Sequence, residues 1–259
     1  MDNLAAKNID NSLLTLEQLL DCTDGSLLGD SFDTKSFLFT NVVTDSRNIV
    51  PFSLFVPLIG EFQDGHKYIP QAIENGASVV FVCNSVFENS PEEYLSITKK
   101  NPNVALVLVK NTLTALQYTA QRYVEKFPNL IRVSVTGSSG KTTTKEIAAS
   151  ILSQKYKVIC NKGNLNSETG LPLSCFEIKK EHEVALLEMG MNRENEIGEL
   201  ARTFKPQFAV ITNIGTAHIG MLGSRQKIAQ EKKKVFDYIK KDGAAVIPYS
   251  DDFAGYLAE

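Results

Sequence analysis

The sequence contains no run of eighteen or more apolar residues, so we expect no membrane-spanning helix. Its first residues, MDNLAAKNIDNSLL, lack the basic and then apolar pattern of a signal peptide. The four cysteines show no CxxC or other metal-ligand spacing. These absences together predict a cytoplasmic protein with reduced thiols and no metal site built from cysteine.

The chain also lacks an excess of basic residues. Lysine and arginine number 27 against 30 aspartates and glutamates, and the net charge is −3. A chain without a basic field is not expected to bind nucleic acid. The sequence has 259 residues, of which 43% are hydrophobic, so it can form one large domain or two ordinary ones.

The first half alternates short apolar runs with amphipathic segments. We predict helices at 66–77 and 112–126, and strands at 39–46, 53–60, 78–84 and 103–110. Pro128 then interrupts the pattern, because proline disfavours helix at the residue before it. The sequence therefore predicts a domain boundary there, with a small N-terminal α/β domain at 1–128 and a second domain at 129–259.

The second half repeats the alternation with longer Val/Ile/Leu runs. The predicted helices are 145–154, 194–204 and 226–240, and the predicted strands are 130–135, 156–161, 184–190, 207–215 and 244–248. Continuous apolar strands separated by helices are typical of a parallel sheet covered on both faces. We predict an α/β fold with a mostly parallel sheet.

The strongest local motif is TGSSGKTTT at 136–144, between a predicted strand and a predicted helix. Glycines let backbone N–H groups turn toward an anion, and a helix N-terminus adds positive potential. Lys141 would reach the β- and γ-phosphates of a nucleotide, and the Thr142 hydroxyl would bind Mg²⁺. The remaining predicted nucleotide-binding residues of this loop are Gly137, Ser138, Ser139, Gly140 and Thr143. Val135 stands where the common pattern has glycine, and the alternative is a glycine turn with an exposed lysine.

Two further candidates lie at predicted strand ends, where ligands bind in open α/β sheets. Glu188 follows four apolar residues, and a carboxylate there is costly unless it is paired or binds a metal. The alternative is an exposed strand end. His218 lies in the loop after the strand at 207–215, but Mg²⁺ prefers oxygen ligands. A histidine hydrogen-bonded to backbone is therefore the simpler interpretation from chemistry alone.

Lys232 lies in the stretch QEKKKVF, where three lysines follow one another. It is four residues after Ile228 and four before Phe236, so helical spacing places it in the apolar stripe. Its two neighbouring lysines turn away from that stripe. Either its ammonium reaches solvent along a buried stem, or it is a desolvated lysine with a lowered pKa. A neutral amine can react with CO₂ to form a carbamate, an anion able to hold Mg²⁺.

Five ordered motifs resemble the Mur ligase family: TGSSGKTTTKE, NKGNLNSETGLP, LLEMGMNRENEIGEL, TNIGTAHIGMLGS and IAQEKKKVF. The stretch at 42–82 also resembles the uridine-binding domain of that family. The resemblance implies that Lys141 and Thr142 hold ATP and magnesium, and that Glu188 and His218 bind metal. Lys232 matches a lysine that is carbamylated (N6-carboxylysine) in several relatives, and with Lys141 and His218 it forms the predicted catalytic set.

The resemblance also implies substrate contacts. Asn164, in GNLN, matches a residue near the nucleotide-sugar substrate and the metal ions. Ser46 and Arg47, in TDSR, resemble the uridine-diphosphate contacts of the first domain. The alternative for TDSR is a turn closed by Asp45.

Within the family, the motifs are most similar to the members that add D-alanyl-D-alanine to UDP-MurNAc-tripeptide. The implied cofactors are ATP and two Mg²⁺ ions, and the implied reaction forms an amide bond through an acyl phosphate. Two alternatives stay open: a diaminopimelate- or lysine-adding relative, and a fragment that binds a nucleotide or UDP-sugar without turnover. The family's third domain has no counterpart here, so we expect this chain to be inactive alone, and we expect a monomer.

Overall fold

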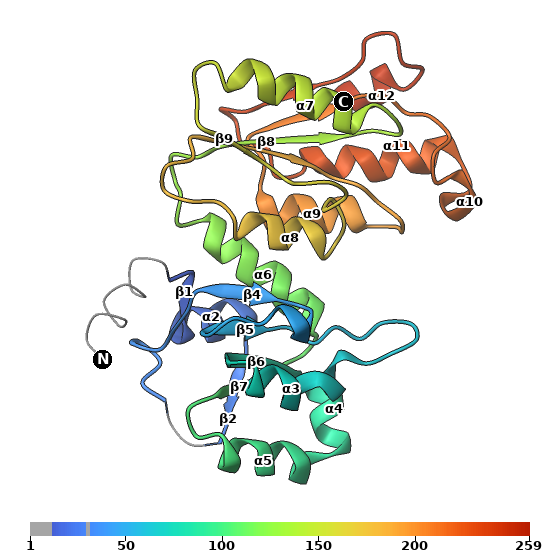
Figure 1. Ribbon diagram of the computed structural model, residues 1–259. Coiled ribbons are helices and arrows are strands. Elements are labelled where there is room, and N and C mark those ends of the chain that lie inside the picture. Colours follow the sequence, from blue (N-terminus) through green and yellow to red (C-terminus); the bar gives the residue numbers. More distant parts are fainter. Residues whose placement is uncertain (1–11, 30–31) are drawn as a thin grey trace. The chain divides into compact units, whose positions relative to one another are not determined.

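The structure is a computed structural model that describes residues 12–29 and 32–259. The chain divides into two compact units, Met1–Tyr123 and Val124–Glu259. Figure 1 labels elements of both units where there is room. Val124 is the last residue of helix α6 (Thr112–Val124), so this division falls a few residues before the boundary predicted at Pro128.

The first unit is built on a five-stranded sheet in the order β2-β7-β6-β5-β4, within the described residues. The central strand β6 pairs in parallel with β5 and β7, and β2 at the edge is antiparallel to β7. The strands are β2 (Ser26–Leu28), β4 (Asn41–Val43), β5 (Ser53–Phe55), β6 (Ala77–Cys83) and β7 (Ala105–Val109). The buried run of β6 explains its central place, because a strand covered on both faces excludes polar residues.

The helices of this unit connect and cover the strands. Besides α6, they are α2 (Leu16–Thr23), α3 (Ile69–Glu74), α4 (Asn84–Asn89) and α5 (Pro91–Lys100). A separate antiparallel pair joins β1 (Leu14–Thr15) to β3 (Leu38–Phe39). Helix α2 begins with a capping box, in which Thr15 and Gln18 each accept a backbone N–H from the other.

The second unit carries a parallel sheet of five strands in the order β12-β11-β8-β10-β9. Its strands are β8 (Ile131–Thr136), β9 (Val158–Cys160), β10 (Val184–Glu188), β11 (Phe208–Ile211) and β12 (Ala244–Val246). Its longer helices are α7 (Lys141–Leu152), α9 (Glu196–Phe204) and α11 (Arg225–Lys233), and its shorter ones are α8 (Gly170–Cys175), α10 (Ile219–Leu222) and α12 (Ala254–Ala258). Figure 1 shows α7 on one face of this sheet and α8 and α9 on the other.

The predicted α/β class is confirmed, and each predicted strand has its counterpart in the structure. The helix predicted at 226–240 is shorter than expected: α11 ends at Lys233, and the chain then tightens into a 3₁₀ turn at Lys234–Phe236. The sequence reading missed α2, α4, α5, α8 and α10. Helices α4, α8 and α10 have at most six residues, so their apolar periodicity extends over too few residues to be recognised. Helices α2 and α5 have eight and ten residues and were missed although α9, with nine, was predicted.

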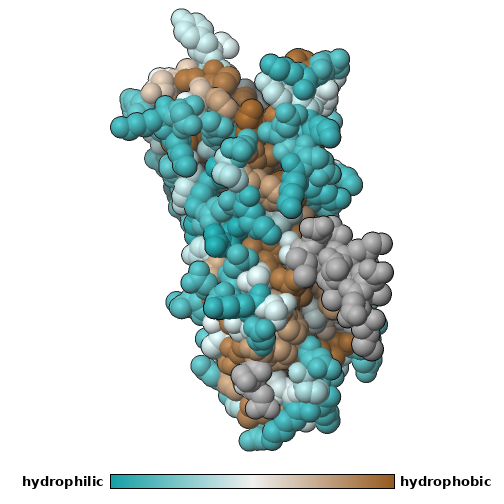
Figure 2. Space-filling view, turned by 90° about the vertical axis from the view of Figure 1, so that its left-hand side faces the viewer, coloured by the Kyte–Doolittle hydropathy of each residue, from teal (hydrophilic) through white to brown (hydrophobic). Residues whose placement is uncertain are grey.

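Apolar side chains are concentrated inside each unit. In the first unit Phe55, Val80 and Leu106 belong to one buried cluster. Figure 2 shows one face of the molecule, where hydrophilic residues cover much of the surface and apolar residues lie in patches between them. Among the described residues, no helix is both long and apolar enough to cross a membrane.

Candidate functional site

The predicted phosphate loop joins the end of β8 to the first turn of α7 in the second unit. Gly137 has φ 151°, and a Cβ atom there would lie 1.8 Å from Thr212 Oγ1. Gly140 has φ 75° and is the residue before α7, a conformation that costs little only for glycine. A Cβ at Gly140 would meet nothing within 4 Å, so this side of the loop is open. The glycines are therefore required for two reasons, close packing at Gly137 and backbone conformation at both.

The loop is held in shape by the residues that follow β11. Asn213 Oδ1 accepts hydrogen bonds from the N–H groups of Ser138, at 3.1 Å, and Ser139, at 3.0 Å. Asn213 Nδ2 donates to Ser139 Oγ at 2.7 Å, and Thr212 Oγ1 donates to Ser139 O at 2.6 Å. The sequence reading missed Thr212 and Asn213. Their position at the carboxyl end of a predicted strand was the available signal.

Lys141 and the threonines after it form the first turn of α7. Lys141 is half-buried, and its Nζ donates to Gly137 O at 3.1 Å, which folds the side chain back over the loop. Thr142 and Thr143 are exposed. A twelve-residue helix that begins at Lys141, with open space beside Gly140, suits an anion such as a nucleotide phosphate.

Glu188 is the last residue of β10, and it lies next to the phosphate loop. Its side chain is only 2% exposed. Thr142 Oγ1 donates to Glu188 Oε2 at 2.7 Å, and Asn166 Nδ2 donates to Glu188 Oε1 at 2.7 Å. Both donors are neutral groups, so neither forms an ion pair with the carboxylate. A hydroxyl and a carboxylate side by side are the hard oxygen donors that Mg²⁺ prefers, so the residues present fit this ion.

Lys232, at the end of α11, is 1% exposed, which confirms the prediction that it lies in the buried stripe. Its neighbours Lys233 and Lys234 are partly exposed, and each donates a hydrogen bond from Nζ. Burial, the largest cause, and the nearby Lys141 ammonium together lower the pKa of Lys232 from its ordinary value of 10.5 to about 7, against the opposing effect of the Glu231 carboxylate. Of the two readings, the desolvated lysine is therefore the one that the structure supports.

His218 precedes α10 and has φ 66°, an uncommon conformation for a residue other than glycine. Its pKa is lowered by partial burial and by the ammonium groups of Lys232 and Lys141, and is raised by the carboxylate of Glu196. The three predicted catalytic side chains therefore act on one another electrostatically. Within the described ranges, no three residues among His, Cys, Asp and Glu lie close enough to hold one metal ion.

The loop after β9 places the two asparagines of GNLN in different surroundings. Asn164 is exposed, whereas Asn166 contacts the Glu188 carboxylate. The backbone turns between them, and the Asn166 N–H donates a hydrogen bond to Asn164 O, with an N–O distance of 2.8 Å. The motif GNLN contains two asparagines, and only the folded loop distinguishes them.

In the first unit, Ser46 and Arg47 line a pocket of about 580 Å³, formed also by Tyr68 and Gln71. Ser46 Oγ donates to Gln71 Oε1 at 2.7 Å. Arg47 is exposed and pairs with Asp45, and this pairing lowers the pKa of the Asp45 carboxyl to about 2. The pocket thus offers a hydroxyl, a guanidinium and an aromatic ring to a ligand.

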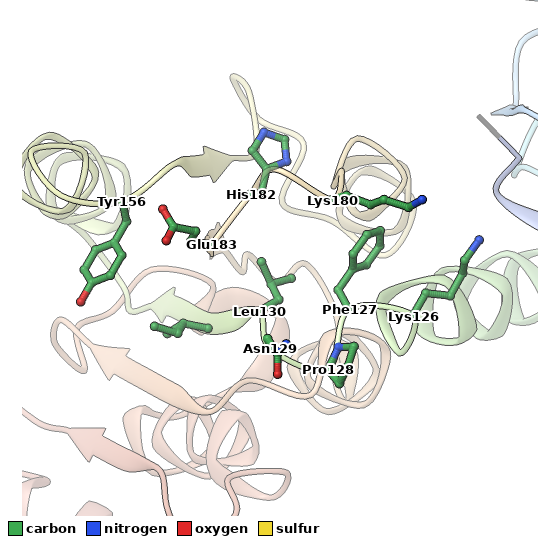
Figure 3. A pocket seen from close by; sticks show the side chains of 10 residues that line it. Lys126, Phe127, Pro128, Asn129, Leu130, Tyr156, Lys180, His182 and Glu183 are labelled. Carbon is green, nitrogen blue, oxygen red and sulfur yellow. The ribbon is translucent and has the colours of Figure 1, made fainter. Parts of the chain in front are cut away.

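A second pocket, of about 390 Å³, lies in the second unit (Figure 3). Leu130, Tyr156 and Glu183 line it, and each of them lies just before a strand of the parallel sheet. This pocket is therefore at the amino ends of β8, β9 and β10, whereas the phosphate loop and Glu188 are at the carboxyl ends. This pocket therefore cannot be the site to which both the phosphate loop and Glu188 contribute.

Family models match both units. Residues 135–259 match the "Mur ligase middle domain", and residues 38–123 match the "Mur ligase family, catalytic domain". Two curated relatives carry the name UDP-N-acetylmuramoyl-tripeptide–D-alanyl-D-alanine ligase. The one from Treponema pallidum is 41% identical over 236 residues, which cover 91% of this chain and 50% of the relative. The one from Bacillus subtilis is 38% identical over 232 residues, which cover 90% and 48%.

Solved structures of MurF are also similar to this chain. MurF from Acinetobacter baumannii matches with a TM-score of 0.82 and 33% identity over 94% of this chain and 50% of its own. MurF from Thermotoga maritima in complex with ADP matches with a TM-score of 0.71 and 31% identity, over 84% and 48%. The chain spans about half the length of the curated relatives it matches. With matching models in both units and the expected arrangement of loop and carboxylate, the chain belongs to the Mur ligase family.

Proposed function

We propose that the protein takes part in joining UDP-N-acetylmuramoyl-tripeptide to D-alanyl-D-alanine, with hydrolysis of ATP to ADP and phosphate. The observation that best supports this is the buried Glu188 carboxylate, which accepts a hydrogen bond from Thr142 in the first turn of α7. The names of the relatives that are 31–41% identical support the choice of substrates. The proposed place of action is the cytoplasm, where ATP is available, and the four cysteines are free, as a reducing compartment requires.

The reaction needs an activated carboxyl group, because a carboxylate is a poor electrophile. The tripeptide carboxylate attacks the γ-phosphorus of ATP, and the bond to the β-phosphate oxygen breaks to give an acyl phosphate and ADP. The amine of the dipeptide then attacks the acyl carbon, phosphate leaves, and the amine loses a proton. In this proposal the protein contributes mainly position and charge.

The residues of the second unit have distinct roles in this proposal. The backbone N–H groups at the start of α7 and the Lys141 ammonium would bind the β- and γ-phosphates and offset their charge. Thr142 and Glu188 would hold Mg²⁺, which would supply neutralisation of negative charge in the reaction. His218 would assist at a second Mg²⁺ ion, and Asn164 would contact the nucleotide-sugar substrate from its exposed loop.

Lys232 would act as a carbamate. The ammonium first loses a proton, and the neutral amine then attacks the carbon of CO₂. A new N–C bond forms as one C=O π bond opens, and a second proton leaves the nitrogen, so that a cation becomes an anion with the release of two protons in all. The support is its burial beside Lys141: two ammonium groups repel each other there, whereas a carbamate and an ammonium attract. The carbamate would also provide oxygen atoms for the second Mg²⁺ ion.

The pocket beside Ser46 and Arg47 would bind the uridine diphosphate. Its volume of about 580 Å³ is sufficient for a nucleotide, and Tyr68 offers a ring face for stacking. Arg47 would bind the diphosphate, since a guanidinium matches phosphate oxygens in a two-bond contact. We propose that the protein is a monomer.

The test is phosphate release from ATP by the protein at its natural length. The expected result is release that requires both UDP-N-acetylmuramoyl-tripeptide and D-alanyl-D-alanine, and that is lost in Lys141→Met. Release that instead requires diaminopimelate or lysine with the shorter dipeptide precursor would transfer the proposal to that relative. Binding of nucleotide or UDP-sugar with no phosphate release under any substrate combination would indicate a binding module and refute the ligase.

A further inference from the structure

Lys145 is a fully buried lysine that neither the phosphate loop nor the proposed reaction uses. It lies one turn after Thr142 on α7 and is 1% exposed. Its Nζ donates to Asn161 O at 2.8 Å and lies 3.0 Å from Glu146 Oε1. A buried ammonium is costly to maintain, so a lysine with these two partners calls for an explanation.

Asn161, which Lys145 contacts, is itself 2% exposed and directly follows β9. The backbone pairing of β9 with β10 ends at Cys160 and Leu186, and beyond it the side-chain amide of Asn161 bonds to the backbone of β10. Asn161 Oδ1 accepts from Glu188 N at 2.9 Å, and Asn161 Nδ2 donates to Glu188 O at 3.0 Å. A second bond from Nδ2 reaches Leu165 O at 2.8 Å. Both backbone polar groups of Glu188 are thus held by one side chain.

These contacts close a ring of hydrogen bonds around Glu188. Helix α7 reaches the carboxylate directly through Thr142, and reaches the backbone of the same residue through Lys145 and Asn161. We call Lys145, Asn161 and Thr142 the Glu188 ring. Since Thr142 and Lys145 are three residues apart on one helix, the ring ties the carboxylate to the helix that follows the phosphate loop.

The chemistry of the ring leaves the carboxylate free for a cation. Lys145 donates to the backbone carbonyl of Asn161 and forms an ion pair with Glu146, not with Glu188. The carboxylate itself receives hydrogen bonds from the neutral groups of Thr142 and Asn166. A lysine bonded directly to Glu188 would instead compete with Mg²⁺. The arrangement orients an anion without neutralising it.

We propose that Lys145 and Asn161 are positioning residues that hold the Glu188 carboxylate beside Thr142, and that they thereby set the Mg²⁺ affinity of the site. This inference rests on the proposed function, because it takes Glu188 and Thr142 as the Mg²⁺-binding pair. It assigns a role to the buried Lys145. Thr142 contacts the end of β10 directly, whereas Lys145, one turn later, contacts Asn161 after β9, whose side chain holds the backbone of Glu188.

The experiment measures ATP binding by calorimetry over a series of Mg²⁺ concentrations, with the full chain. Lys145→Met keeps the apolar stem and removes the ammonium. It is expected to raise the Mg²⁺ concentration for half-maximal ATP binding about 10- to 100-fold. Asn161→Ala is expected to act in the same direction. Lys145→Gln, which keeps a donor, should recover part of the affinity and serves as the measurement if the methionine variant does not fold.

A double-mutant cycle with Glu188→Gln separates positioning from general stability. If Lys145 acts through Glu188, Lys145→Met should change the Mg²⁺ dependence less than about twofold in the Glu188→Gln background. An equal shift in both backgrounds, or a lower melting temperature with an unchanged Mg²⁺ dependence, would overturn the inference. The matched control is Lys155→Met, which removes an exposed lysine just after α7 and should leave the Mg²⁺ dependence unchanged.

The wild-type protein distinguishes the two proposals. Mg²⁺-dependent ATP binding by the wild type, together with an unchanged Lys145→Met variant, contradicts the positioning role and leaves the proposed function standing. No Mg²⁺-dependent ATP binding by the wild type contradicts the proposed function, and this inference falls with it.

Discussion

Replacing Lys232 with methionine is expected to stabilise the folded protein near neutral pH. Methionine has a similar length and no ammonium group. Burial lowers the pKa of Lys232 from 10.5 to about 7, so the folded state binds this proton more weakly than the unfolded chain does. At any pH below about 7 the lysine is charged in both states, and the folded state carries the full cost of burying the charge.

The magnitude follows from the pKa difference. Each pKa unit corresponds to about 1.36 kcal/mol, so the buried charge lowers the free energy of unfolding by about 5 kcal/mol at pH 6.5. This cost declines as the pH rises from about 7 toward 10.5, because the folded state has then already released the proton. The advantage of Lys232→Met should therefore fall to about 2 kcal/mol at pH 9.

The assay is urea unfolding of wild type and variant at pH 6.5 and 9, followed by circular dichroism. The buffers are free of CO₂, so that Lys232 stays an amine. Hydrogen exchange of the amides of α11 assigns the transition to the second unit. The matched control is Lys233→Met, which loses the bond from Lys233 Nζ to Tyr256 O, at 2.7 Å, and should be less stable by about 1 kcal/mol.

Two results would refute this reasoning about Lys232. One is a Lys232→Met variant that is no more stable than the wild type at pH 6.5. The other is a stability difference that stays constant between pH 6.5 and 9, since a pH-independent effect would come from packing and not from a buried charge. Either would mean that the ammonium is solvated in the folded state.

Three further predictions concern single contacts. Gly137→Ala would place a Cβ atom 1.8 Å from Thr212 Oγ1 and should lower the free energy of unfolding by at least about 2 kcal/mol in thermal unfolding; an unchanged melting temperature would contradict the close packing. Thr142→Val should weaken ATP binding about 10- to 100-fold in the presence of Mg²⁺ but not in its absence, measured by calorimetry, and an equal loss in both would argue against a metal contact. Arg47→Ala should raise the pKa of Asp45 from about 2 toward its ordinary value, which an NMR titration measures. The same variant should bind UDP about tenfold more weakly, and unchanged UDP binding would exclude Arg47 from the ligand contacts of the pocket.

Several features of this protein could be predicted from the sequence because they depend on neighbours along the chain. The phosphate loop is a contiguous motif, and the strands around it are continuous β-branched runs. The burial of Lys232 also follows from local spacing, since α11 places it on the same side as Ile228. The end of that helix could not be read in the same way, because the tightening at Lys234 interrupts the period on which the prediction rests.

The tertiary structure decided which distant side chains meet. Thr142 and Glu188 are 46 positions apart and become partners only because β8 and β10 are adjacent in the sheet. Asn166, and not Asn164, donates a hydrogen bond to the Glu188 carboxylate, and Lys145 donates to Asn161. Both contacts depend on the path of a loop that has no periodic sequence pattern. Sequence spacing reports contacts within one element, whereas contacts between elements depend on strand order and register, which the chain acquires only on folding.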